Sequence, residues 1–389
     1  MNCKKRNLPA AAGLLLSLAL SSGGCGSGGS SPAGVHAGSS QLATGTALTP
    51  SPALVKTMAL PGFGNGISLD RTHNRVYVAA GGSSGQNNIE VIDGPSATLA
   101  GITPVFSNPV SVAVDPGLNH VFAVDRGFSA NYTYPTSSNL TVIAAGSNLA
   151  LVSTLVGQTL AEAIDNPTSS EVYVANPPGG SPDTSNSLLI LNPATGLPVK
   201  SITVGYSAMD SYNNFGARRF AVDRTRNVTY VSNGADNTIS VVAGGTDTVT
   251  TPIQGLSGPI AVDETSGRIY VLNVSAGQVF AVDGASYQRV SSYSLTKSAV
   301  DTSEAPADVA VDASVQKLYV VTLDGFTPAG NTLTTIDLPT GTARTVEIPG
   351  IPADPYSYPN AVVANPDDHR VYVSNGYDLS ISIYDGTKL

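Results

Sequence analysis

Residues 260–273 read I-A-V-D-E-T-S-G-R-I-Y-V-L-N, and this phrase decides the fold because the chain contains six further versions of it. Each version is a short apolar stretch ending in Asp or Asn, a tight polar turn, and a second stretch that in most copies has the form x-Tyr-Val-x-Asn. The other versions occupy residues 67–81, 112–125, 162–176, 220–233, 309–322 and 362–375. Short runs of β-branched and aromatic residues around a polar turn predict two antiparallel strands.

The period of the phrase predicts the architecture. The last residue of each first stretch is its anchor, and the anchors, which recur every 40 to 58 residues, are Asp70, Asp115, Asp165, Asp223, Asp263, Asp312 and Asn365. A third apolar stretch follows each phrase, as at residues 239–242 and 279–283, and a turn and a fourth stretch complete the unit. Seven repeats of four short antiparallel strands predict an all-β, seven-bladed β-propeller. No segment has the helical period that a parallel α/β sheet requires.

The recurring V-Y-V-x-N phrase resembles the repeats of the YVTN family of bacterial and archaeal β-propellers. The resemblance covers about 330 residues and implies the propeller fold, but it implies no particular activity because propellers host unrelated functions.

The two ends of the repeat region are expected to meet. The seventh unit stops after I-S-I-Y-D at residues 381–385 and supplies no fourth strand. An unpaired strand edge would expose a row of backbone donors and acceptors. Residues 53–62 precede the first unit and resemble the fourth strand of the third unit at residues 198–205. We therefore predict that this N-terminal strand completes the last blade and closes the ring.

The first residues are an export signal in this interpretation. Residues 1–24 combine Lys4, Lys5 and Arg6, an apolar stretch and small residues, which predicts a lipoprotein signal peptide with Cys25 as the lipidated residue. Residues 25–52 form a Gly/Ser-rich tether and residues 53–389 the propeller. The expected location is the outer membrane, on its periplasmic or surface face. A plain secretory peptide cut near Cys25 is the alternative.

Composition narrows the class of partner. The net charge is -9 and the isoelectric point about 4.8, so no basic surface is available to neutralise nucleic-acid phosphates. Membrane contact is expected through the lipid anchor only.

The long connections are the first candidate binding region. Antiparallel topology places the segments 125–139, 176–187, 206–218, 296–307, 323–331 and 349–359 on one rim. Loops held by a rigid scaffold often carry binding residues. The aromatic residues in these loops that are expected to bind a protein or glycan partner are Tyr132, Tyr134, Tyr212, Phe326, Tyr356 and Tyr358. The alternative is that these rings only pack the loops against the blades.

Charged residues at the channel mouth on the same rim are the second candidate. Glu162, Arg218, Arg219 and Asp308 lead the first strands of blades three, four and six. They would hold an anionic or polar ligand, or would pair with one another. Asp210, Asp301, Glu304 and Asp308 offer oxygen ligands for Ca²⁺, but their spacing matches no calcium loop. No other cofactor is expected.

The histidines bear on catalysis. His73, His120 and His369 all fall in first-to-second turns on the opposite rim, so a general base on the long-loop rim would have to be a carboxylate or Tyr. The repeated anchor Asp is explained by hydrogen bonding within its turn. The leading hypothesis is a non-catalytic binding or scaffold propeller of the cell envelope. The alternatives are a lactonase-like hydrolase or lyase, and a propeller subunit of a redox complex whose cofactor lies on a partner.

Overall fold

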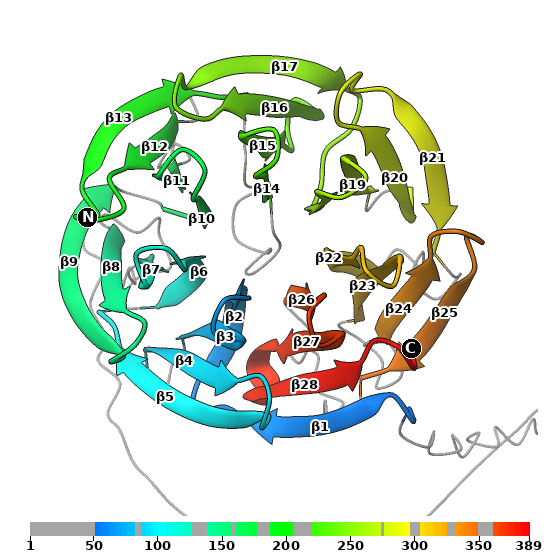
Figure 1. Ribbon diagram of the computed structural model, residues 1–389, viewed down its shortest axis with the longest axis horizontal. Helices are drawn as coiled ribbons and strands as arrows, with labels where there is room; N and C mark the ends of the chain where they lie inside the picture. The colour runs from blue at the N-terminus through cyan, green and yellow to red at the C-terminus, as the bar shows by residue number, and fades with distance from the viewer. Residues whose placement is uncertain are drawn as a thin grey trace, which may run out of the picture. The chain divides into compact units, whose positions relative to one another are not determined.

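The protein folds into a ring of seven four-stranded antiparallel sheets, as a computed structural model shows (Figure 1). The structure describes residues 51–81, 87–106, 108–126, 138–157, 160–176, 187–205, 219–273, 276–295, 304–324, 332–348 and 361–389. The first strands of consecutive blades contact one another, and those of blades one and seven also meet. The predicted seven-bladed propeller is confirmed.

Six blades run from the channel outward in chain order, and blade seven takes its outermost strand from the N-terminal side of the first repeat. The first strands, which surround the channel, are β2 (Phe63–Asp70), β6 (Pro109–Asp115), β10 (Ala163–Asn166), β14 (Phe220–Asp223), β18 (Ile260–Asp263), β22 (Glu304–Asp312) and β26 (Ala361–Asn365). The second strands are β3 (Arg75–Gly81), β7 (His120–Asp125), β11 (Glu171–Asn176), β15 (Val228–Asn233), β19 (Arg268–Asn273), β23 (Lys317–Asp324) and β27 (Arg370–Asn375).

The third and fourth strands form the outer half of each blade. The third strands are β4 (Asn88–Asp93), β8 (Ser138–Ala144), β12 (Ser187–Leu191), β16 (Thr238–Ala243), β20 (Gln278–Asp283), β24 (Thr332–Asp337) and β28 (Ser380–Asp385). The fourth strands are β5 (Thr98–Pro104), β9 (Leu149–Gly157), β13 (Pro198–Thr203), β17 (Thr248–Gln254), β21 (Arg289–Ser294), β25 (Ala343–Glu347) and, for blade seven, β1 (Leu54–Ala59).

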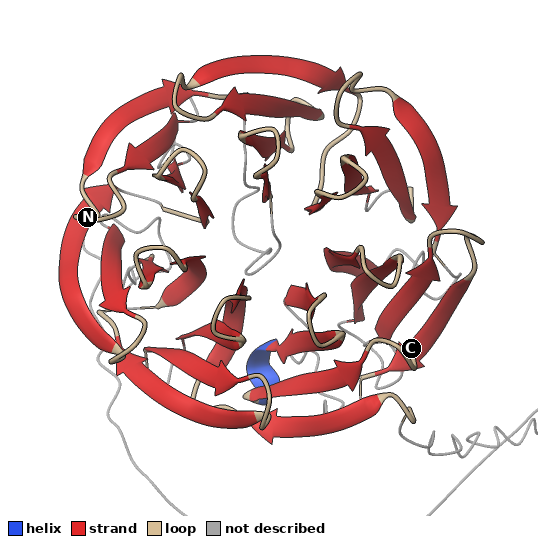
Figure 2. Ribbon diagram, viewed as in Figure 1, coloured by secondary structure: helices blue, strands red, loops and turns tan. Residues whose placement is uncertain are grey.

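The described residues are almost entirely strands and short turns (Figure 2). A single turn of 3₁₀ helix, Gly376–Asp378, joins β27 to β28. None of the described helical residues forms an apolar helix of membrane-spanning length.

Ring closure follows the prediction. β1 pairs with β28 in antiparallel register, with Thr57 opposite Ser382 and Ala59 opposite Ser380. Backbone hydrogen bonds extend the pairing at both ends: the N–H of Asp385 donates to the carbonyl of Ala53 at 2.8 Å, and that of Leu60 to the carbonyl of Leu379 at 2.6 Å. The strand before the first repeat therefore supplies the outer strand that the seventh lacks.

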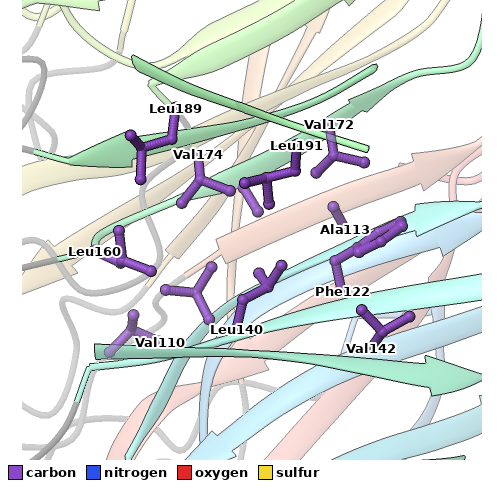
Figure 3. Close-up of a cluster of buried hydrophobic side chains, with 12 residues drawn as sticks. Val110, Ala113, Phe122, Leu140, Val142, Leu160, Val172, Val174, Leu189 and Leu191 are labelled. Atoms are coloured by element: carbon purple, nitrogen blue, oxygen red, sulfur yellow. The ribbon is translucent and has the colours of Figure 1, made fainter. Parts of the chain in front are cut away.

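The hydrophobic core consists of seven clusters, one between each pair of neighbouring blades. β15 and β16 are buried along almost their whole length, whereas β13 is mostly exposed. Strands covered on both faces are expected to be apolar throughout, which accounts for the Val-rich inner strands. In the cluster between blades two and three, Phe122 and Val142 of one blade pack with Val172 and Leu191 of the next (Figure 3).

Large and small side chains alternate across these interfaces. Ala221, two residues before its anchor, packs in one cluster with Ile260, three residues before the next anchor. Ala261 and Val309 form the corresponding pair between blades five and six. The small residue also lies opposite the buried Tyr of the second strand, as Ala261 does opposite Tyr270. Large residues of one blade therefore pack against small residues of the next at these interfaces.

The Asn that ends the repeated phrase connects the second and third strands of its blade. Asn233 Nδ2 donates to Thr238 Oγ1 at 3.0 Å and to Ser240 Oγ at 2.9 Å. Asn375 makes the matching bonds to Ser380 and Ser382 at 2.9 and 3.0 Å. The phrase is thus explained by hydrogen bonding inside the blade.

The anchors stabilise their turns, with one correction to the sequence prediction. Asp115 Oδ1 accepts from the N–H of Leu118 at 3.0 Å, and Asp263 Oδ1 from that of Thr265 at 2.9 Å. In blade three the residue paired like the other anchors is Asn166, opposite Glu171, so the expected anchor Asp165 is wrong by one position. The turn between β10 and β11 therefore begins at Pro167, one residue later than an anchor at Asp165 would place it.

Candidate functional site

The predicted site residues Glu162 and Asp308 occupy equivalent positions, four residues before the anchors Asn166 and Asp312. Glu162 Oε2 accepts a hydrogen bond from the backbone N–H of Arg219, the residue that precedes β14, at 2.7 Å. Asp308 Oδ2 accepts from the N–H of Val362 in β26 at 2.9 Å, and its Oδ1 from the N–H of Val309 at 2.9 Å. Each carboxylate therefore joins its own blade to the next.

A third blade makes the same connection with a hydroxyl group. Ser111, four residues before Asp115, accepts through Oγ from the backbone N–H of Ala163 at 3.2 Å. The residues that carry these oxygens are buried. The backbone N–H groups that they accept from would lower stability if they were buried between blades without an acceptor. The geometry explains the polar residues at this position as links between blades.

The other predicted residues divide between described and undescribed parts of the chain. Arg219 is half-buried and contributes the N–H that Glu162 binds. The candidates outside the described residues are Cys25, Tyr132, Tyr134, Tyr212, Arg218, Phe326, Tyr356 and Tyr358. Of the calcium candidates, Asp210, Asp301 and the side chain of Glu304 also lie outside them. Among the described residues no group of three or more His, Cys, Asp or Glu side chains gathers as a metal site would.

The ring encloses a central channel with a cavity of about 520 Å³, lined by the first strands of all seven blades. Its wall includes Glu162, but Arg219 and Asp308 are not among the described lining residues. The residue just before the anchor contributes an apolar side chain in six blades: Leu69, Val114, Val222, Val262, Val311 and Ala364. A cavity of this size, in which apolar side chains lie beside convergent charged groups, is typical of small-molecule sites.

Two ion pairs lie in the short first-to-second turns, at the end of the channel that these turns surround. Arg71 of blade one binds Asp367 of blade seven through two hydrogen bonds of 2.9 and 2.7 Å. The pairing raises the pKa of Arg71 and lowers that of Asp367. Glu264 of blade five accepts from the backbone N–H of Arg224 of blade four at 2.9 Å, and the side chains approach to 3.7 Å. Both pairs connect neighbouring blades and line the cavity.

Asp165 is the lining residue that the anchor misassignment concealed. It occupies, in blade three, the position just before the anchor, where the other six blades carry the apolar ring. The side chain is only 6% exposed, and its Oδ1 has no hydrogen-bond partner among the described residues. Burial, with a smaller contribution from nearby Asp115, raises the pKa of Asp165 to about 8, against a lowering effect of Arg224.

A spacing in the sequence marks this displacement. The anchor precedes the buried aromatic residue of the second strand by seven positions, as in Asp115 and Phe122 or Asp263 and Tyr270. Seven positions before Tyr173 stands Asn166. Counting back from Tyr173 would therefore have placed Asp165 among the apolar residues of the first strand.

Two further buried carboxyl groups lie away from the cavity wall. Glu90 of β4 accepts through Oε1 from the N–H of Gly62 at 3.0 Å, and Asp125 of β7 accepts through Oδ2 from the hydroxyl of Thr141 at 2.9 Å. Burial raises the pKa of each to about 7. Asp125 stands where other repeats have the phrase-ending Asn.

Comparisons with known proteins support the fold and do not identify a family or a ligand. No protein-family model matches the sequence, and no curated protein sequence matches it. Among solved structures, the chain is similar to the β-propeller domain of Cps50 (Swd1) from Myceliophteria thermophila, with a TM-score of 0.62 over 85% of this chain and 98% of that one. The two are 9% identical, so the likeness shows a shared architecture and nothing about ligands.

Proposed function

We propose that the protein is a non-catalytic binding or scaffold propeller of the cell envelope, with repeats of the YVTN type, that presents one rim to a protein or glycan. The proposal depends on the way chain length is distributed between the strands. Connections from second to third strands and between blades leave at one end of the antiparallel blades, and these include the long segments 126–137, 177–186, 204–219, 295–303, 325–331 and 348–360.

The opposite rim is built differently. Its first-to-second turns are short in every blade, as at residues 116–119 and 264–267, and are held by the anchor side chains. A closed ring with bound ends gives the long segments a rigid base, the arrangement in which loops commonly carry recognition. The use of Glu162 and Asp308 as links between blades also favours binding over a hydrolase or lyase site built on these two carboxylates.

The envelope location is part of the same proposal. Lipid attached to Cys25 would hold the ring at a membrane through residues 25–52, whose Gly- and Ser-rich composition suits a flexible tether. Metabolic labelling with an alkynyl fatty acid tests this step. Wild-type protein should carry the label and Cys25→Ser protein should not; equal labelling of both would refute lipidation at Cys25.

The binding proposal is tested by changing each rim in turn. In one variant a short Gly-Ser linker replaces residues 127–137, and in the control the same linker is inserted after Gly245 in a short turn of the opposite rim. Both proteins, with wild type, are used to capture partners from envelope extract and to probe a glycan array. We expect wild type and the control to retain one set of ligands that the 127–137 variant loses.

Thermal melting of the purified proteins separates lost binding from lost folding. If all three melt alike and recover identical ligands, or none, the rim proposal fails. A turnover in a substrate screen that survives in wild type and control and disappears in the 127–137 variant would replace it with the enzymatic alternative.

A further inference from the structure

The central channel contains a carboxyl group that the fold itself does not use. In the other turns the anchor side chain accepts the turn N–H groups, and in blade three Asn166 Oδ1 accepts from the N–H of Thr168 at 3.2 Å. The turn is thus complete without Asp165, whose Oδ1 is buried without a partner among the described residues. A buried polar group without a hydrogen bond costs stability, so its presence calls for an explanation outside the turn.

The surroundings of Asp165 define what it can bind. The described wall of the cavity carries five carboxyl groups, Glu162, Asp165, Asp263, Glu264 and Asp367, and two guanidinium groups, Arg71 and Arg224. Arg71 is held by Asp367, and Arg224 lies against Glu264. The excess of acidic groups makes the cavity attractive to a cation.

The apolar ring limits the kind of cation. In the same layer as Asp165 the other blades contribute Leu69, Val114, Val222, Val262, Val311 and Ala364, none of which offers a side-chain ligand to a metal ion. Such walls favour the hydrocarbon part of a ligand. An ammonium group has three donors and no acceptor, which complements an ionised carboxylate.

We propose that the channel binds a small organic cation whose ammonium group pairs with Asp165 while its hydrocarbon part packs against the apolar ring. This site is separate from the rim of the proposed function and does not depend on it. The raised pKa of Asp165 adds a pH dependence: an ammonium ligand must bind the ionised carboxylate, so binding strengthens as the pH rises through about 8. Asp115 and Arg224 are the charged groups that act on the pKa of Asp165. The other charged groups on the cavity wall are Arg71, Glu162, Asp263, Glu264 and Asp367.

The test uses cyclohexylamine, with cyclohexanol and cyclohexanecarboxylate as neutral and anionic controls of similar shape. Each is titrated into the full chain by calorimetry at about pH 6.5 and 9, both below the pKa of the amine. We expect saturable binding of the amine alone, stronger at the higher pH. Asp165→Asn should weaken it by about tenfold or more, because the amide carries no charge. Glu90→Gln, which changes a buried carboxyl group away from the cavity wall, should leave binding unchanged.

Asp165→Val separates a binding role from a structural one. Val matches the residue found at this position in four other blades, so this variant should lose amine binding and melt at the wild-type temperature or above. The proposal is overturned if wild type does not bind the amine, if the alcohol binds as tightly, or if Asp165→Asn binds like wild type. A large fall in the melting temperature of Asp165→Val, with amine binding unchanged in Asp165→Asn, would assign Asp165 to the fold.

Discussion

At the residue scale, the carboxylates between blades behave as structural acceptors. Asp308 is fully buried and binds two backbone N–H groups, one in its own strand and one in β26. Hydrogen bonds to a charged acceptor are stronger than neutral ones. A buried donor left without a partner lowers stability by the full desolvation penalty of that group. The function of such a residue is read from what its oxygens contact, because its type alone suits both a catalytic and a structural role.

Removing the Asp308 carboxylate should therefore destabilise the ring. We expect Asp308→Ala to lower the free energy of unfolding by about 2–4 kcal/mol, since the N–H groups of Val309 and Val362 both lose their acceptor. Urea denaturation followed by circular dichroism measures the change. Ser147→Ala, at an exposed turn, is the control and should stay within about 0.5 kcal/mol of wild type. Equal stability of both variants would contradict the structural role.

The buried acids Glu90 and Asp125 predict how stability varies with pH. Their pKa values are about 7 in the folded protein and close to 4 when unfolded, so the folded state holds protons that the unfolded state has released. Their contribution is thus fully favourable below about pH 4 and is lost as the pH rises through about 7, at up to roughly 1.4 kcal/mol per pH unit for each group.

The measurement is the unfolding free energy of wild type and of the Glu90→Gln, Asp125→Asn double variant at about pH 5 and 8. Wild type should lose more stability than the double variant over this interval. The substitutions keep an oxygen for Gly62 and Thr141, and Asp125→Asn introduces the amide that ends the phrase in other blades. An identical pH slope in both proteins would refute the assignment.

At the scale of the element, the blades differ in how their outer strands meet solvent. β9 is the fourth strand of blade two, and Leu149, Leu151 and Leu155 on it are all more than half exposed. It contains no charged residue, unlike β13 with Lys200 or β21 with Arg289. Charged side chains and prolines on an outer strand both discourage pairing with another chain. The outer strands β5 and β17 also lack charge, but each contains a proline, whereas β9 contains neither and is the least protected described outer strand.

At the scale of the whole molecule, stability depends on joining the two ends of the chain. The last blade has three strands from the C-terminal repeat and one, β1, from the N-terminal side. On the channel side, the Arg71–Asp367 ion pair links blade one to blade seven. Because every core cluster lies between two blades, an open ring would leave clusters incomplete on both sides of the gap. Closure therefore supports the whole ring.

Deleting residues 53–61 should lower the thermal midpoint by at least about 5 °C, because the edge of β28 and part of two clusters would be exposed. A synthetic peptide of residues 51–62, added in excess to the shortened protein, should restore part of the loss by pairing with β28. Calorimetry measures both effects. An unchanged midpoint after deletion would show that β1 does not hold the ring together.

The sequence by itself determined the blades, their number and their closure. Apolar strands, turn residues and a last repeat that lacks its fourth strand are local patterns, and a closed ring of seven blades is the fold that pairs every strand. The sequence also contained the spacing that identifies Asn166 as an anchor. Only the tertiary structure decided that Glu162 and Asp308 bind the next blade, that Arg71 meets Asp367 across the join, and that Asp165 stands in an apolar ring around the channel. Those relations arise when curvature brings residues from distant repeats together, and a one-residue shift on a strand reverses the face that a side chain presents.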